Sequence, residues 1–186
     1  MRALVLAAAL AVSSFSVPAA AQPSPDRAAA MAKLDWMKGT WRGPASGSNR
    51  DGSRYEVTQT ERIGPMLGGD VLVMEGRGYR ADGSTGFNAF GVVSWDPRSG
   101  KYELRSYAQG MAGTFELKPT ADGYVWEVPA GPGAVVRYTA TLHDGTWTEI
   151  GEYVREGAPA TKTFEMNLRR VGDSRWPLET PVSPKG

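Results

Sequence analysis

The sequence predicts an all-β fold, in which about ten antiparallel strands form an up-and-down barrel behind a short N-terminal helix. Between residues 39 and 171, β-branched and aromatic residues alternate with polar ones, and Gly, Asp and Asn recur about every eight to twelve residues. No segment between two expected strands has the dozen or so residues of a crossover helix, which argues against a parallel βαβ sheet. A sheet of this many strands tends to close and so lose its exposed edges. A β-sandwich of two sheets is the alternative architecture.

The first 21 residues have the pattern of a secretory signal peptide. Arg2 precedes an apolar run at positions 3–12, and small residues stand at positions 19 and 21. The run is too short to span a bilayer of roughly 30 Å, and no later segment approaches about eighteen uninterrupted apolar residues. We therefore expect cleavage after Ala21, a mature protein located in the periplasm or secreted, and no insertion into the membrane.

Residues 22–33 are expected to form a tether and the start of a helix. Asp26 is placed to cap this helix, and the spacing of Ala30, Leu34 and Met37 puts them on one face. Gly39 then ends the helix. In this interpretation, residues 34–171 form a single barrel domain and residues 172–186 form a tail that contains prolines.

Ten segments carry the strand pattern, and turn signals separate them. The stretch from Asp96 to Gly100 has the residues of a strong turn, and Asp144-Gly145 is the signal of a tight hairpin. Residues 64–69 break the alternation and are expected to form a helical turn or a wide loop. The expected strands are 39–46, 54–63, 70–79, 87–95, 101–108, 114–118, 124–128, 134–142, 146–155 and 160–171.

The opening of the expected barrel resembles that of calycin-type barrels, which include lipocalins, fatty-acid-binding proteins and nitrobindins. A short helix with Leu-Asp-Trp-Met-Lys at 34–38 leads into Gly-Thr-Trp-Arg-Gly at 39–43. A Gly-Gly pair stands before a later strand, and residues 87–91 precede a Trp-Asp-Pro turn. With these features, residues 34–170 are also similar to a family of uncharacterised, often exported bacterial proteins, the domain of unknown function family 1579.

The resemblance implies a barrel with a central cavity and a Trp packed at its closed end. Trp41 opens the first strand and would fill the base of the barrel, where Leu34 and Met37 of the helix would cover it. These three residues are therefore expected to be a structural plug rather than ligand contacts.

Aromatic residues fall on nearly every expected strand, and most of them are expected to pack in the core. Some of them, Trp126 included, are expected to line an apolar pocket. Period two puts Arg105 and Tyr107 on one face of their strand. If that face points inward, the pair would hold a carboxylate through charge-assisted hydrogen bonds; if it points outward, both residues are solvated surface.

Arg137 and Glu75 are the other polar candidates for the ligand site. Each alternates with apolar or aromatic residues on its strand. The argument for Arg137 is the weaker one, because Val136, Tyr138 and Ala140 form a core face across from it.

The composition of the chain limits which classes of partner and cofactor we expect. The signal contains one Arg and no acid, so its removal would leave 20 basic and 20 acidic residues, whereas nucleic-acid binders usually carry a basic excess. The sequence has no Cys and one His, His143, at an expected hairpin tip. A catalytic zinc takes about three protein ligands, so no metal site is assigned. No Gly-x-Ser-x-Gly nucleophile motif accompanies His143, so no catalytic residue is assigned. Nitrobindins bind haem through an axial histidine near the end of their barrel; no histidine lies on the last expected strands here, so no cofactor is predicted.

Three functions remain open. The first is an exported container for a small apolar or amphipathic molecule, because aromatic residues with a few polar ones are typical of ligand pockets. The second is a cell-envelope scaffold or interaction module whose barrel is filled by its own side chains. The third is an enzyme that works through carboxylates and Tyr in the same cavity. The sequence favours the first, and it leaves the ligand, the strand register and the oligomeric state undetermined.

Overall fold

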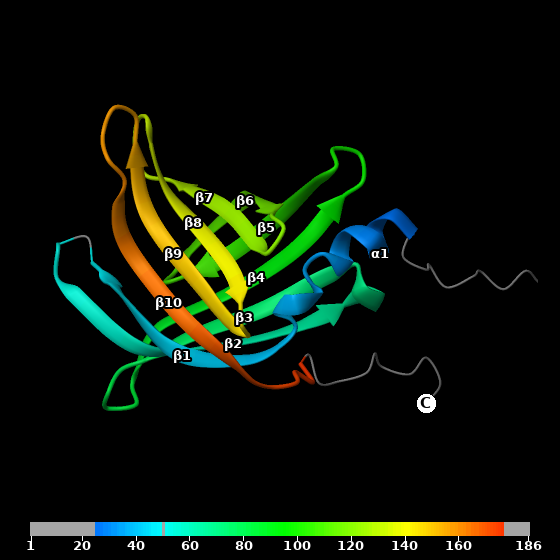
Figure 1. Ribbon diagram of the computed structural model, residues 1–186, viewed down its shortest axis with the longest axis horizontal. Coiled ribbons are helices and arrows are strands. Elements are labelled where there is room, and N and C mark those ends of the chain that lie inside the picture. Colours follow the sequence, from blue (N-terminus) through cyan, green and yellow to red (C-terminus); the bar gives the residue numbers. More distant parts are fainter. Residues whose placement is uncertain (1–24, 50, 177–186) are drawn as a thin grey trace, which may run out of the picture.

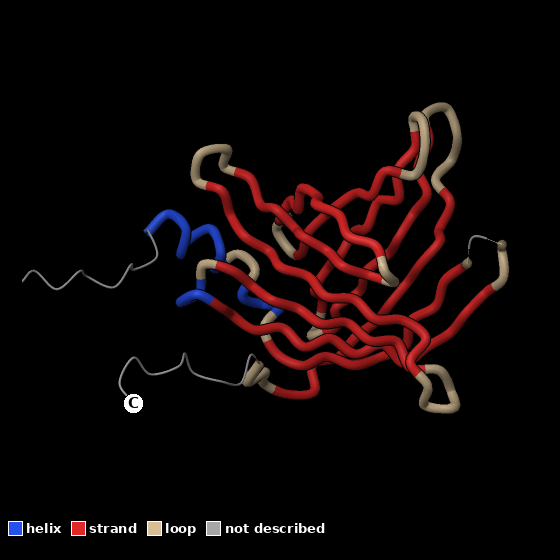
Figure 2. Tube along the Cα trace, turned by 180° about the vertical axis from the view of Figure 1, so that it is seen from behind, coloured by secondary structure: helices blue, strands red, loops and turns tan. Residues whose placement is uncertain are grey.

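A computed structural model gives the architecture of the chain and describes residues 25–49 and 51–176. It confirms the expected barrel: the described residues form ten antiparallel strands that close in the order β1-β10-β9-β8-β7-β6-β5-β4-β3-β2. Each strand pairs with its neighbours in the sequence, and β1 pairs with β10 to complete the ring (Figure 1). Figure 2 shows the same ring from behind. The expected signal peptide, its cleavage point and the tail from residue 177 lie outside the described residues.

The strands follow the predicted segments closely. Short helical segments precede the barrel and follow β2: α1 (Pro25–Ala32), η1 (Asp35–Met37) and η2 (Leu67–Gly69). The strands are β1 (Gly39–Ser48), β2 (Arg54–Met66), β3 (Val71–Tyr79), β4 (Thr85–Asp96), β5 (Lys101–Ala108), β6 (Met111–Pro119), β7 (Gly123–Pro129), β8 (Ala134–His143), β9 (Thr146–Arg155) and β10 (Thr161–Gly172).

Two tight turns of the barrel differ in how clearly the sequence predicts them. Asp144 and Gly145 both have positive φ, 47° and 69°, as a two-residue hairpin with the Asp-Gly signal requires. The turn between β5 and β6 has the same form, with φ of 51° at Gln109 and 79° at Gly110. Gln is an unusual residue at a position with positive φ, so the sequence gives no clear signal of this turn. β6 begins at Met111, three residues before the start that was expected at residue 114.

The single expected helix is divided in two. Instead of running from Asp26 to Met37, the chain leaves α1 at Ala32 and tightens, with the N–H of Leu34 bonded to the carbonyl of Met31 three residues back. Leu34 has φ of −105° and ψ of 7°, and η1 begins after it. The break lets both Leu34 and Met37 point into the barrel end, where neither is exposed to solvent.

These helical segments close one end of the barrel (Figure 1). The Trp41 indole N–H donates to the Met37 carbonyl at 2.9 Å, and the Tyr102 hydroxyl of β5 donates to the Ala30 carbonyl of α1 at 2.8 Å. Arg27 of α1 also pairs with Asp70 at 2.9 Å. Leu34, Met37 and Trp41 lie together in the main hydrophobic cluster, as buried packing against the strand ends requires.

None of the helices within the described ranges combines the length and the apolar character that crossing a membrane demands.

The barrel has its shortest stretch of strand pairing between β6 and β7. These strands share only three residue pairs, which end at Leu117 opposite Trp126. Continued register would set Glu116 directly opposite Glu127. Each acid instead turns away from its counterpart: Glu116 pairs with Lys101 at 3.1 Å and Glu127 pairs with Arg137 at 2.7 Å. We call this unpaired stretch the β6–β7 seam.

Candidate functional site

A group of polar side chains faces the interior of the barrel above the helical plug. Gln59 and Glu61 of β2 lie on the inner face of the strand, in phase with the fully buried Ile63. The Gln59 amide donates a hydrogen bond to the Glu61 carboxylate at 2.7 Å. The carboxylate rests on the bare backbone of Gly76 in β3, where an added Cβ would lie 2.6 Å from Oε1.

The other two residues of this group, Tyr124 and Glu149, come from the C-terminal half of the chain. Glu149 of β9 is 8 % exposed and accepts a short hydrogen bond from the Tyr124 hydroxyl of β7. Ala140 of β8 lies between them and is paired with both residues. Its methyl group leaves room for the two larger side chains to meet across it. We refer to Gln59, Glu61, Tyr124 and Glu149 as the interior polar cluster.

Burial shifts the ionisation of the cluster toward neutral forms. It raises the pKa of Glu61 from its usual 4.5 to about 8, against the hydrogen bond from Gln59 and with added repulsion from Glu149. Burial also raises the pKa of Glu149 to about 7, although the hydrogen bond from Tyr124 opposes this. The pKa of Tyr124 rises well above its usual 10, because of burial and the charge of Glu149. Carboxyl groups that interact in this way titrate as a pair near neutral pH.

The aromatic plug forms the floor beneath the cluster. Trp147 packs edge-on against Trp41 at 5.6 Å and against Trp36 at 5.3 Å, and Trp36 stacks on Tyr124 at 6.0 Å between ring centroids. The Trp147 indole nitrogen is close enough to the Tyr124 hydroxyl to lower its pKa, but it makes no hydrogen bond of acceptable geometry. A buried N–H without a proper acceptor costs about 1–3 kcal/mol. The Tyr124 hydroxyl oxygen is thus the acceptor that the structure offers to this N–H.

Above the cluster, the inner wall is aromatic and only partly buried. Trp126 stacks on Tyr138 at 4.5 Å, and Phe115 and Phe164 adjoin this pair at 5.4 and 6.1 Å. All four face inward by register, yet each keeps partial exposure to solvent. Glu61 is likewise partly accessible although protein surrounds it. The interior above the plug is therefore reached by water.

The inward orientation considered for Arg105 and Tyr107 is wrong. Tyr102 and Leu104 of β5 are buried inside the barrel, so period two turns Arg105 and Tyr107 to the outer face. Arg105 pairs with Glu103 at 2.7 Å, and Tyr107 is 53 % exposed. Arg137 is also on the outside, bonded to Glu127, because the opposite face of β8 points inward as expected.

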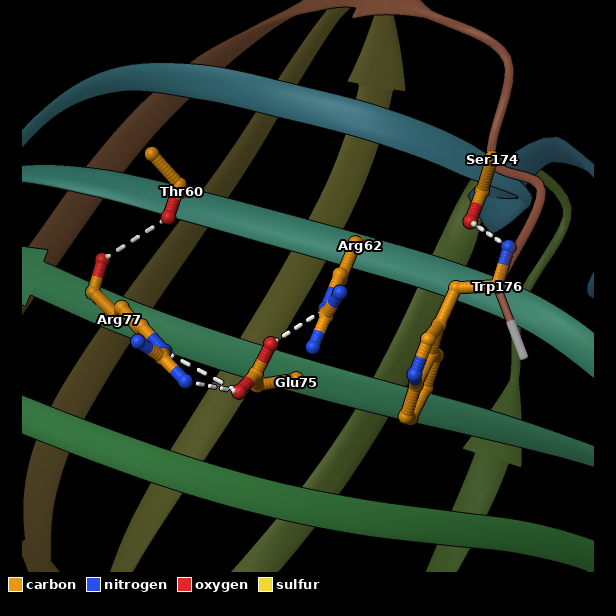
Figure 3. A network of polar contacts seen from close by, with 6 residues as sticks. All are labelled: Thr60, Arg62, Glu75, Arg77, Ser174 and Trp176. Carbon is orange, nitrogen blue, oxygen red and sulfur yellow. Dashed lines mark hydrogen bonds and ion pairs between the residues drawn. The ribbon is translucent and has the colours of Figure 1, made fainter. Parts of the chain in front are cut away.

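Glu75 also lies on the outer face, within a charged network. It accepts hydrogen bonds from Arg77 and from Arg62, whose guanidinium lies 4.9 Å from the Trp176 ring centroid (Figure 3). Burial alone would raise the pKa of Glu75, but the two arginines lower it below its usual 4.5. A groove of about 460 Å³ adjoins this network, and Phe90, Tyr107, Met111 and Trp176 line its apolar part. Glu75 and Tyr107 thus share one groove, which is on the outside.

Of the predicted ligand residues, Trp126 alone faces the interior. The residues that sequence reasoning did not select are those of the interior polar cluster. A signal for two of them is present: Glu61 alternates in phase with Val57 and Ile63, and Glu149 is in phase with Trp147. An acid in the apolar phase of a strand indicates a buried carboxyl group.

Comparison with known proteins supports the fold alone. No family model matches the chain, and no curated protein matches it. Among solved structures, the chain is similar to Rv2717c from M. tuberculosis, with a TM-score of 0.57 and 16 % sequence identity. The match covers 76 % of this chain and 96 % of that one.

Proposed function

We propose that the barrel is a container for a small apolar or amphipathic molecule. The observation that carries this proposal is the inner wall: aromatic side chains face the interior and stay partly accessible above a polar cluster. Ligand pockets commonly combine an apolar lining with a few convergent polar groups. Trp126, Tyr138, Phe115 and Phe164 would hold the apolar part of the ligand, and the interior polar cluster would hold its polar end.

The β6–β7 seam is the entrance that we propose for this ligand. Phe115 of β6 and Trp126 of β7 face each other across it at 5.4 Å between ring centroids. Only three residue pairs hold the two strands together, so opening the seam breaks few backbone hydrogen bonds. The plug closes the end of the barrel where the helical segments lie, because Leu34 and Met37 are fully buried there.

Export to the periplasm or the cell exterior belongs to the same proposal. It rests on the signal-peptide pattern of residues 1–21. Membership of a calycin-type group, and of the domain of unknown function family 1579, is likewise proposed on the residues around Trp41 and on the ten-stranded closed barrel. These assignments agree with a carrier that works outside the cytoplasm.

Native mass spectrometry of protein purified gently from the compartment where it accumulates tests the container. We expect an additional mass that disappears on extraction with organic solvent, and the extracted compound should raise the melting temperature of stripped protein. The matched control is a Trp126→Ala/Tyr138→Ala variant, which removes the stacked pair and should lose the adduct. A wild-type protein that carries no adduct and is not stabilised by any apolar compound would contradict the proposal.

The outer groove supports a second candidate function, an interaction module. Phe90 and Tyr107 are 37 % and 53 % exposed on the outer face of neighbouring strands, and Trp176 packs edge-on against Phe90. Met111, 65 % exposed at the start of β6, lines the same groove. An exposed apolar patch of this kind marks many protein contact sites. Retention of a partner from the native envelope fraction by wild-type protein, but not by a Tyr107→Ser/Met111→Ser variant, would favour this function over the container.

A further inference from the structure

The outer groove lies over one row of outward-facing residues, each paired with the next across neighbouring strands. From β2 to β6 this row consists of Arg62, Glu75, Phe90, Tyr107 and Ala112. The row is charged at β2 and β3, aromatic at β4 and β5, and ends in a methyl group on β6. A ligand that lies across these strands would therefore meet charge at one end and aromatic rings at the other.

The aromatic end of the groove has the side chains of a protein interface. Phe90 and Tyr107 lie 6.2 Å apart between ring centroids, and the Tyr107 ring is more than half exposed. Trp176 borders the groove beside Phe90, and Met111 borders it at the start of β6. Aromatic residues, Met and Arg are the types enriched in the cores of protein interfaces. Tyr107 thus offers an uncovered ring between two apolar borders.

Trp176 shows what kind of chain this face of the barrel accepts. It belongs to the segment 173–176, which follows β10 and is neither helix nor strand. Its ring packs edge-on against Phe90 at 6.1 Å between centroids and lies 4.9 Å from the Arg62 guanidinium (Figure 3). The outer face therefore already holds one aromatic side chain that an irregular segment carries across the strands.

The charged end of the groove carries one positive charge in excess. Arg62 and Arg77 both donate to Glu75, one to each carboxylate oxygen, so two guanidinium groups share a single acid. Glu75 is the one acid that lines the groove in the described part of the chain. Arg77 also lines it, and 46 % of its side chain stays exposed. A second carboxylate at this end would balance the charge.

We propose that the outer groove binds an extended segment of a partner protein in which an aromatic residue stands two positions from an acid. The aromatic ring lies on Tyr107 between Trp176 and Met111, and the carboxylate faces Arg77. This inference rests on the second candidate function, the interaction module, and names the chemistry of its partner. A segment with a basic residue in place of the acid is disfavoured, because like charges would meet at the Arg62 and Arg77 end.

The spacing of the two features in the partner follows from the strands below it. Tyr107 and Arg77 lie on β5 and β3, which are two strands apart, so about 10 Å separates them across the sheet. Residues i and i+2 of an extended chain point to one face and lie about 7 Å apart. The long side chain of Arg77 covers the remaining distance. An acid two positions from the aromatic residue therefore reaches the guanidinium while the ring lies on Tyr107.

The test is a calorimetric titration of the protein with four heptapeptides whose ends are blocked. The first is Ser-Asp-Ser-Trp-Ser-Asp-Ser, which offers an acid on either side of the ring and so fits both chain directions. The second and third have Asn or Lys at both Asp positions, and the fourth has Ala in place of Trp. We expect the first to bind about threefold more tightly than the Asn peptide and at least about tenfold more tightly than the Lys peptide. High salt should reduce both differences, and the Ala peptide should not bind.

Variants separate the two ends of the groove, and circular dichroism checks that each one folds. Ala112→Trp fills the groove beside Tyr107 without removing a contact, and it should abolish binding of the Asp peptide. Arg77→Gln should keep binding that depends on Trp but remove the preference for Asp over Lys. Arg137→Gln is the matched control, because Arg137 is an outer-face arginine bonded to one Glu and 44 % exposed, away from the groove on β8. It should change neither.

The possible failures are distinguishable. Equal affinity for the Asp, Asn and Lys peptides would overturn the acidic partner and leave the interaction module standing. Indole-3-acetate that binds as tightly as the Asp peptide would assign the groove to a small aromatic acid instead. Self-association of the wild-type protein in sedimentation velocity, lost in Ala112→Trp, would assign it to a second copy. If no peptide binds, the inference is wrong, and the retention of a partner from the envelope fraction decides the interaction module separately.

Discussion

Tyr124 and Glu149 come from strands that are not neighbours in the sheet, yet the hydroxyl of one donates directly to the carboxyl group of the other. Ala140 makes this contact possible, since it is paired with both residues and is fully buried between them. The same arrangement recurs at Gly151, which lies opposite both Tyr138 and Phe164. Small residues such as Ala140 and Gly151 point into the barrel and leave room above them, where larger side chains from the two flanking strands come into contact.

Enlarging Ala140 should therefore separate Tyr124 from Glu149. We expect Ala140→Leu to lower the free energy of unfolding by about 1–3 kcal/mol, because it overpacks the fully buried site of Ala140 and breaks a buried hydrogen bond. Urea denaturation measures the effect, and Ala112→Leu, at an exposed position of β6, is the control that should change little. Equal stabilities of the two variants would show that the space over Ala140 is not filled by its neighbours.

The interior acids should make the protein less stable as pH rises through neutrality. Their carboxyl groups ionise near 4.5 in the unfolded chain but near 7 and 8 in the folded one. Between these values the unfolded state binds fewer protons, so the free energy of unfolding falls from about pH 4.5 to about pH 8. Glu75 and Glu165 act in the opposite sense, because their lowered pKa values give stability above about pH 4.5 that is lost in acid.

Glu149→Gln isolates this effect. The stability of the variant relative to wild type should increase by roughly 2–3 kcal/mol between pH 5 and pH 8, since each pKa unit corresponds to about 1.4 kcal/mol. Chemical denaturation at a series of pH values gives the difference, and Glu165→Gln should show no such increase. A constant difference across this range would mean that Glu149 ionises normally inside the barrel.

Alternation along single strands was sufficient to predict the barrel and much of its core. Val136, Tyr138 and Ala140 were expected on one face of their strand, and the structure turns that face inward. The face of Arg105 was harder to judge, although Tyr102 and Leu104 carry the apolar phase of the same strand. The interior polar cluster could not be assembled from sequence at all. Tyr124 meets Glu149 only because three strands share one register around Ala140, and register depends on the whole sheet.

The plug should account for a large part of the stability at the closed end. Trp41 is 3 % exposed and is joined to Met37 by a hydrogen bond, so Trp41→Ala should cost about 3–5 kcal/mol. Trp176→Ala is a matched control on the outer face, where the loss is limited to contacts with Arg62 and Phe90, worth about 0.5–1 and about 0.5–1.5 kcal/mol. Thermal melts followed by circular dichroism compare the two. Similar melting temperatures would contradict the role assigned to Trp41.

Locking the β6–β7 seam should slow the exchange of ligand. The chain has no Cys of its own, so a Glu116→Cys/Glu127→Cys pair introduces a single disulfide between positions that continued register would place opposite each other. In the oxidised variant we expect the rate of uptake of a fluorescent apolar probe to fall by at least about tenfold, and reduction should restore it. Lys118→Cys/Val125→Cys is the control, because these residues are already paired and their disulfide leaves the seam as it is. Once mass spectrometry has verified both cross-links, equal uptake rates before and after reduction of the Glu116→Cys/Glu127→Cys variant would place the entrance elsewhere, at the end of the barrel that lies away from the plug.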